Sequence, residues 1–280
     1  MLGAIVGDIM GSSMEFEEQK FEHIDEINLF NEENHFTDDT VLTLAVADWL
    51  LHDIHSIYYD DEKLRIALGR RLVKWTQRYR DKEIAYGLSY MEFFYRAELT
   101  DEYRPQNSYG NGSAMRVSPV GWFFDTIEET MRFAKISADV THNHPEGQKG
   151  AVAVACAIFL ACTGESKEYI KNFILRAFGY ERVSQSFFDL RNAHSRNCTA
   201  QGSVPEAIVS FLESKDFESA IRLAISFGGD TDTMAAISGS IAEAYYGGVP
   251  DHFVEYAKKR MDSEAIDLCE EFCKRLRSAK

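Results

Sequence analysis

The sequence predicts an all-α protein, and three observations support that prediction. Apolar residues recur at spacings of three and four, as at Leu64, Leu68, Leu72 and Trp75, which is the spacing of one helix face. Segments with two-residue alternation and hairpin turns are scarce, and no strand–helix alternation repeats along the chain. The 280 residues are 45% hydrophobic and include only five prolines, so a large helical core can form.

Composition predicts a single soluble domain. No Ser/Gly-rich or low-complexity linker divides the chain, so we expect residues 1–280 to form one domain. The most apolar stretch, residues 151–161, is too short to cross about 30 Å of hydrocarbon and is expected to be a buried helix. The N-terminus lacks the layout of a signal peptide, so we expect a cytoplasmic monomer. The formal net charge of −15 opposes binding to nucleic acid and membranes, which favours a small ligand or a protein as partner.

The five cysteines are odd in number and do not form a metal-ligand pattern. All of them except Cys198 lie inside apolar helical patterns, where a reduced thiol behaves as a small hydrophobe. We therefore expect core thiols rather than disulfides or zinc ligands.

The first predicted helix carries glycines at intervals of four. Gly3, Gly7 and Gly11 share one helix face and have no side chain, so another helix can approach that face closely. Each interior glycine costs up to about 1 kcal/mol of helix propensity, which indicates a packing role. We expect this helix to be central.

Two acidic clusters precede apolar helices, at residues 37–39 (TDD) and 230–233 (DTDT). Either cluster alone is most simply a helix cap. Two glycines, Gly228 and Gly229, allow a sharp turn before the second cluster. Two such clusters can converge only if a cation lies between them. The candidate metal ligands are Thr37, Asp38, Asp39, Asp230, Asp232 and Thr233.

Oxygen-only ligands predict a hard ion, Mg²⁺ or Mn²⁺, rather than zinc. With Glu15, the clusters bring five negative charges, which two divalent ions would largely offset. Without metal, carboxylates about 4 Å apart would repel by roughly 4 kcal/mol per pair at an effective dielectric constant near 20. We therefore expect a metal-free site to be loosened or partly protonated.

Five motifs occur in the order found in one known family. They are GD..GS..E at residues 7–15, FTDDT at 36–40, GNGSAMRVSPVG at 110–121, TH at 141–142 and GGDTDT at 228–233. In these motifs the chain resembles the ADP-ribosylglycohydrolases over nearly its whole length. The resemblance implies a compact, orthogonal multi-helix bundle with a binuclear metal site. It also implies a hydrolase that cleaves the glycosidic bond between ADP-ribose and an acceptor.

The resemblance further implies roles for individual residues. The two acidic runs would hold two Mg²⁺ ions, with Mn²⁺ as a possible substitute and Asp232 as the bridging ligand. Glu15 would be the catalytic residue beside the metals, where it can either ligate them or activate the attacking water, and Asp39 or Asp38 would assist in deprotonating that water. The loop before the AMRVSPVG segment, which is expected to be a helix, would bind the pyrophosphate and ribose. The expected substrate-binding residues are Ser108, Tyr109, Gly110, Asn111, Gly112, Ser113 and His142.

The acceptor stays open at the level of sequence. The family's Gly-Tyr-Gly-x-Gly-like loop is replaced here by residues 85–89 (AYGLS), which bears on the leaving group. We expect ADP-ribosyl-arginine on a protein, or a small ADP-ribose conjugate, as the partner. The alternatives are hydrolysis of a free ADP-ribose derivative or nucleotide, and a non-catalytic ADP-ribose binder.

Overall fold

The computed structural model describes residues 1–15, 23–82 and 84–278. Over these ranges the chain forms α-helices and two short 3₁₀ helices, with no strand beyond an isolated bridge between Gly110 and Thr199. The predicted all-α fold is confirmed. The elements are α1 (Leu2–Ser12), η1 (Ile24–Glu26), α2 (Asp38–His52), α3 (Ile54–Ile57), α4 (Asp61–Arg78), α5 (Leu88–Thr100), α6 (Gly112–Met115), α7 (Ser118–Phe123), α8 (Ile127–Asp139), α9 (Pro145–Cys162), α10 (Lys167–Phe178), η2 (Glu181–Ser184), α11 (Phe187–Ala193), α12 (Ala200–Glu213), α13 (Phe217–Ile225), α14 (Thr231–Tyr246), α15 (Asp251–Lys258) and α16 (Ser263–Ser278).

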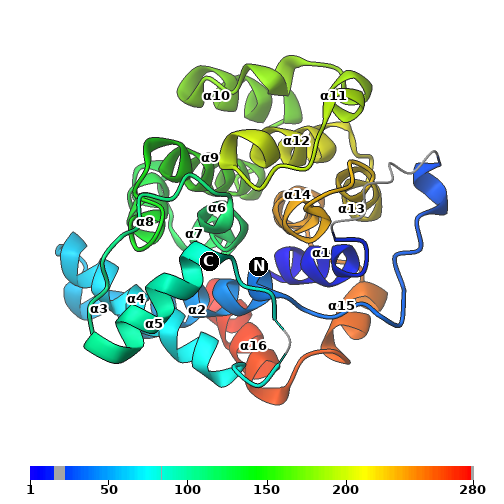
Figure 1. Ribbon diagram of the computed structural model, residues 1–280. Coiled ribbons are helices and arrows are strands. Elements are labelled where there is room, and N and C mark those ends of the chain that lie inside the picture. The colour runs from blue at the N-terminus through cyan, green and yellow to red at the C-terminus, as the bar shows by residue number, and fades with distance from the viewer. Residues whose placement is uncertain (16–22, 83, 279–280) are drawn as a thin grey trace.

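The glycine face of α1 packs directly against α14, and the two helices lie side by side in the middle of the molecule (Figure 1). A Cβ atom on Gly7 would lie 2.1 Å from the carbonyl oxygen of Ala235. The equivalent distance is 2.2 Å from Gly3 to the oxygen of Gly239, and 2.5 Å from Gly11 to the oxygen of Thr231. Only glycine fits at these positions, so the predicted close helix contact and central position of α1 are confirmed.

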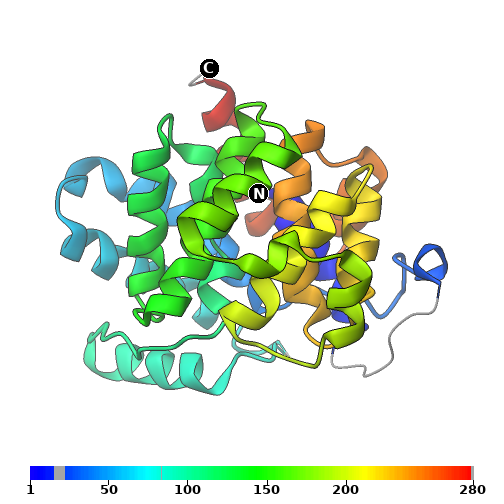
Figure 2. The same cartoon turned by 90° about the horizontal axis from the view of Figure 1, so that it is seen from above.

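A second buried helix, α9, contains the apolar stretch 151–161 as expected. It packs against α6, α7, α8, α12 and α14. Figure 2 shows α3, α4 and α5 on one side of the molecule and α12, α13 and α15 on the other. No helix in the described ranges is long and apolar enough to cross a membrane.

Two other expectations meet different outcomes. All five cysteines are free; Cys156 and Cys269 are buried, whereas Cys198 is exposed. The AMRVSPVG segment, residues 114–121, is expected from the sequence to be one helix, and this is wrong, because it is divided between the short helices α6 and α7. Pro119 lies in the first turn of α7, where its missing N–H is tolerated, and an uninterrupted helix would require that N–H.

Candidate functional site

The site is built from the beginnings of two helices, α2 and α14. Thr37 caps α2 in an extended conformation, and its Oγ1 accepts a hydrogen bond from the backbone N–H of Asp39 at 3.3 Å. Gly228 and Gly229 precede α14 with φ angles of 73° and 77°, which side-chain-bearing residues rarely adopt. This turn lets α14 begin at Thr231 with its acidic residues facing the start of α2.

Asp8 fixes the start of α2 against α1. Its fully buried carboxylate accepts hydrogen bonds from the backbone N–H groups of Thr37 and Thr40, both at 3.0 Å. The hydroxyls of the same two threonines also donate to it, at 2.8 Å and 2.5 Å. Burial raises the pKa of Asp8, and these hydrogen bonds act in the opposite direction. We did not assign Asp8 a role from sequence, although a carboxylate inside an apolar, glycine-striped helix was a usable signal.

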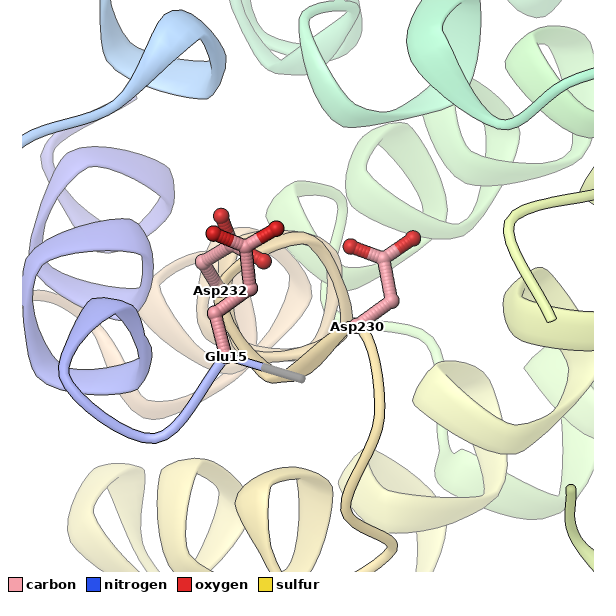
Figure 3. A group of neighbouring side chains, drawn as sticks. All are labelled: Glu15, Asp230 and Asp232. Carbon is pink, nitrogen blue, oxygen red and sulfur yellow. The ribbon is translucent and has the colours of Figure 1, made fainter. Parts of the chain in front are cut away.

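Three carboxylates gather where α1 ends and α14 begins. One oxygen from each of Glu15, Asp230 and Asp232 lies within 4.8 Å of the others, and Figure 3 shows their carboxylates grouped there. Asp39 joins them through Thr233, whose hydroxyl donates to Asp39 Oδ2 at 3.0 Å. The other oxygen of Asp39, Oδ1, is buried and has no hydrogen-bond partner among the described residues.

Crowding and burial penalise the charged forms of these carboxylates. Burial raises the pKa of Glu15 to about 7, and the charges of Asp230 and Asp8 act in the same direction. Burial, followed by neighbouring carboxylates, holds the pKa values of Asp38, Asp39 and Asp232 well above their usual range. A group of oxygen donors that repel one another, with an orphaned buried oxygen among them, suits a hard divalent cation.

The glycine-containing loop at 108–112 lies beside the carboxylates. Asn111 connects the two, because its Nδ2 donates to Asp230 Oδ2 at 2.6 Å and to Ser203 Oγ at 3.1 Å. The backbone N–H of Asn111 donates to the carbonyl of Cys198 at 3.0 Å, which anchors the loop. A Cβ atom on Gly112 would lie 3.1 Å from His142, so glycine leaves the space that the imidazole ring uses.

These groups surround one cavity of about 250 Å³ between α2, α5, α6 and α14. Most of the residues predicted from sequence line it. They are Glu15, Asp38, Asp39, Ser108, Gly110, Asn111, Gly112, His142, Asp230, Asp232 and Thr233.

Three predicted site residues do not line the cavity. The hydroxyl of Thr37 donates to Asp8, and that of Ser113, which is fully buried, donates to the carbonyl of Gly147 at 2.9 Å. Tyr109 is 55% exposed, and its ring makes an edge-on contact with His144. Thr37 and Ser113 therefore hold the local structure, and Tyr109 lies outside the cavity.

The structure adds residues that sequence reasoning left out. These are Arg116 and Tyr90, which line the cavity although both are buried. Gly87 and Ser89, from the 85–89 loop already connected with the leaving group, also line it at the start of α5. Arg116 lies within the matched motif at 110–121, so a charged residue inside an apolar segment was the available signal. Leu88, which is 91% exposed, points away from the protein.

An all-helical fold with carboxylate groups from two helix starts beside a glycine-containing loop defines a class of hydrolase-like proteins. The model of the ADP-ribosylglycohydrolase family matches residues 1–279 of this chain. The protein belongs to the ADP-ribosylglycohydrolase family, whose members hydrolyse glycosidic bonds.

Several curated relatives match over most of their length. ADP-ribosylhydrolase ARH3 from Gallus gallus is 27% identical, with 86% of this chain and 79% of the relative covered. The Homo sapiens ARH3 is 26% identical, with 88% and 84% covered. ADP-ribosylarginine hydrolase Tri1 from Pseudomonas putida is 25% identical, with 91% and 72% covered.

A solved structure has the same fold. It is described as an ADP-ribosylglycohydrolase-related protein complex and superposes with a TM-score of 0.73 at 23% identity. The superposition covers 98% of this chain and 95% of that one. The expected compact bundle of this family is therefore confirmed.

Proposed function

We propose that this protein hydrolyses the N-glycosidic bond between ADP-ribose and an arginine side chain of a protein, using two Mg²⁺ ions. The observation that carries the proposal is one cavity that joins a carboxylate cluster to a glycine-containing loop and a buried histidine. The cluster suits metal and water, whereas the loop and the histidine suit the phosphates and ribose of a nucleotide.

The residues at the cavity fit a pair of hard cations, which Mn²⁺ would also satisfy. The residues that would hold them are Asp38, Asp39, Asp230, Asp232 and Thr233. Asp39 Oδ1, which is buried and has no hydrogen-bond partner among the described residues, is free to ligate a metal ion. Thr37 would contribute mainly by holding the start of α2, since its hydroxyl donates to Asp8. Bound Mg²⁺ would supply charge stabilisation and acidify water.

The chain's own groups can perform the remaining steps. Glu15, at the edge of the cluster, is placed to orient a water molecule and accept its proton, and Asp39 lies on the opposite helix start to assist. The water oxygen would bond to the anomeric carbon as the bond to the guanidinium nitrogen breaks. The bonding electrons would leave with that nitrogen, and the neutral guanidine would take up the proton that Glu15 holds. Asn111, Gly110 and Gly112 would bring backbone and amide groups to the substrate.

Two observations favour arginine as the acceptor. The cavity is lined by five carboxylates, Glu15, Asp38, Asp39, Asp230 and Asp232, so one negative charge would remain beside two divalent ions and would favour a cationic guanidinium group over a neutral hydroxyl. One relative, Tri1, is named for ADP-ribosylarginine hydrolysis.

The first experiment measures release of free ADP-ribose from matched peptides that carry the modification on arginine or on serine. Release from the arginine peptide with Mg²⁺, and its loss with a chelator, is the expected result. Release only from the serine peptide would show that the acceptor is serine and not arginine. Binding of ADP-ribose without release from either peptide would favour a binding protein, and cleavage of the pyrophosphate would favour a nucleotide hydrolase.

A second experiment separates chemistry from binding. Glu15→Gln keeps the size of the side chain but removes its basicity, and we expect kcat to fall by about 10²–10⁴. ADP-ribose affinity should change little, since the loop and His142 are untouched. Glu26→Gln, at an exposed position of η1, is the matched control. An unchanged kcat in Glu15→Gln would remove Glu15 from the reaction.

A further inference from the structure

A buried arginine lies behind the histidine of the cavity. Arg116 has no solvent exposure, and its Nη2 donates to the carbonyl of Ser137 at 3.0 Å and to the hydroxyl of Thr141 at 2.9 Å. Burial lowers the pKa of Arg116 to about 10, which leaves the guanidinium charged at neutral pH. A guanidinium can only donate hydrogen bonds, so the direction of the bond to Thr141 is certain.

That direction determines the next hydrogen bond. Thr141 Oγ1 lies 2.6 Å from Nδ1 of His142, and the hydroxyl has one proton to donate. Thr141 is 1% exposed, and among the described residues its hydroxyl makes no hydrogen bond other than those with Arg116 and with Nδ1. If Nδ1 carried a proton, the threonine oxygen would accept two hydrogen bonds and its own proton would be buried without a partner, at a cost of about 1–3 kcal/mol.

We propose that Arg116 and Thr141 act as positioning residues that hold His142 in the tautomer with its proton on Nε2. The relay runs from the guanidinium to the hydroxyl and from the hydroxyl to Nδ1. The proton on the far side of the ring then faces the cavity. His142 is thereby a neutral hydrogen-bond donor, and the hydrogen bond from Thr141 to Nδ1 fixes the orientation of its ring.

The surroundings of Nε2 agree with this assignment. Cβ atoms placed on Gly112 and Gly110 would lie 3.1 Å and 3.5 Å from Nε2, so the ring's donor edge faces the loop. No hydrogen bond to Nε2 comes from the described part of the chain, and His142 lines the cavity. Burial lowers the pKa of His142 to about 3, and the charge of Arg116 acts in the same direction, which excludes the doubly protonated ring at neutral pH.

The donor calls for an oxygen acceptor on the ligand, either a phosphate oxygen or a ribose oxygen. This step rests on the proposed function, because ADP-ribose supplies both kinds of oxygen beside the loop. The tautomer itself rests only on the protein's hydrogen bonds. The two parts can therefore be tested separately.

The test uses ¹⁵N-labelled full-length protein and long-range ¹H–¹⁵N correlation spectra, with His142 assigned by its absence in His142→Gln. We expect Nδ1 of His142 to resonate as an unprotonated nitrogen and Nε2 as a protonated one. Thr141→Val keeps the shape but removes the hydroxyl, and it should yield a mixture of tautomers. Thr141→Ser should restore the single form. A protonated Nδ1 in the wild-type protein, or an unchanged spectrum in Thr141→Val, would overturn the proposal.

Binding measurements with ADP-ribose and with Mg²⁺ alone complete the test. Thr141→Val should weaken ADP-ribose binding about tenfold, which corresponds to one hydrogen bond of roughly 1.4 kcal/mol, and Thr141→Ser should recover it. Mg²⁺ affinity should be equal in all three proteins, which reports that the fold is intact. If the tautomer changes as expected while no variant binds ADP-ribose, the relay is supported and the ADP-ribose ligand is rejected.

Discussion

Asn111 belongs both to the loop and to the carboxylate cluster. Because its Nδ2 donates to Asp230 at 2.6 Å and to Ser203 at 3.1 Å, the amide fixes the rotamer of a candidate metal ligand. Partners of this kind typically change metal affinity by 10–100-fold when removed. We expect Asn111→Ala to weaken Mg²⁺ binding by about tenfold or more, measured by titration calorimetry on the metal-free protein.

Ser108→Ala provides the control, because the Ser108 hydroxyl accepts only a hydrogen bond within the loop, from the backbone N–H of Gly110. It should leave Mg²⁺ affinity unchanged. Equal Mg²⁺ affinity in Asn111→Ala and the wild-type protein would show that Asp230 needs no support. Sequence placed Asn111 in the loop correctly, but its bond to Asp230 spans 119 residues, which local spacing cannot reveal.

Asp8 should matter for stability and for the metal site together. Asp8→Asn keeps one acceptor oxygen but turns an N–H₂ group toward the donors of Thr37 and Thr40. We expect the free energy of unfolding to fall by about 2–4 kcal/mol, measured by urea denaturation. Mg²⁺ affinity should fall too, because the start of α2 carries Asp38 and Asp39. Asp25→Asn, at an exposed position, should change neither quantity.

At the scale of elements, the contact between α1 and α14 gives the sharpest stability prediction. Gly7→Ala would improve helix propensity by up to about 1 kcal/mol in an exposed helix. Here the added methyl group would lie 2.1 Å from the Ala235 carbonyl oxygen, so the helices must separate. We expect a net loss of about 1–3 kcal/mol, or failure to fold, measured by thermal and urea unfolding.

Gly87→Ala is the matched control for this prediction. Gly87 caps α5 at a φ of −59°, and a Cβ atom there would meet nothing within 4 Å. Its unfolding free energy should stay within about 0.5 kcal/mol of the wild-type value. A stable Gly7→Ala protein with unchanged activity would contradict the close helix contact.

The elements also show where sequence reasoning stops. The glycine spacing predicts a face that another helix approaches, but it contains no information about which helix, because α14 lies more than 200 residues away. The polar residues Thr37 and Asp230 predict the starts of α2 and α14 closely. Thr37 does so by local capping, since its hydroxyl accepts a hydrogen bond from the N–H of Asp39. Asp230 makes no side-chain cap hydrogen bond, and its carboxylate accepts one from Asn111 instead. The break between α6 and α7 was missed, although Pro119 was visible in the sequence.

At the scale of the whole molecule, the fold brings together groups that the chain keeps far apart. Helix periodicity predicted the class, and the motif order predicted which residues share a site. The parts that escaped prediction are tertiary hydrogen bonds, such as those of Asp8 with Thr37 and Arg116 with Thr141. Each depends on how two helices cross, which is set by packing over the whole core and not by local pattern.

The carboxylate cluster should make the stability of the metal-free protein depend on pH in a definite direction. The pKa of Glu15 is raised from its ordinary 4.5 to about 7, and the pKa values of Asp38, Asp39 and Asp232 are raised as well. Between the unfolded and folded pKa values the folded state holds more protons than the unfolded state. The cluster's contribution to stability is therefore largest at low pH and is lost as pH rises toward the folded pKa values.

Carboxylates elsewhere also make stability depend on pH; one of them is Asp48, whose pKa is lowered. Comparing the wild-type protein with Asp232→Asn separates the effect of the cluster from theirs. With chelator present, raising the pH from about 5 to about 8 should lower the unfolding free energy of the wild-type protein relative to Asp232→Asn. Mg²⁺ should reverse the trend in the wild-type protein, because the ion binds only the deprotonated carboxylates and so stabilises more at the higher pH. Equal pH dependence in the two proteins would mean that the carboxylates do not destabilise the folded state at high pH. Mg²⁺ stabilisation that is independent of pH would mean that these carboxylates do not bind the ion. Since α1, α2 and α14 all contribute to the cluster, the stability of the central helices and metal binding should then vary together.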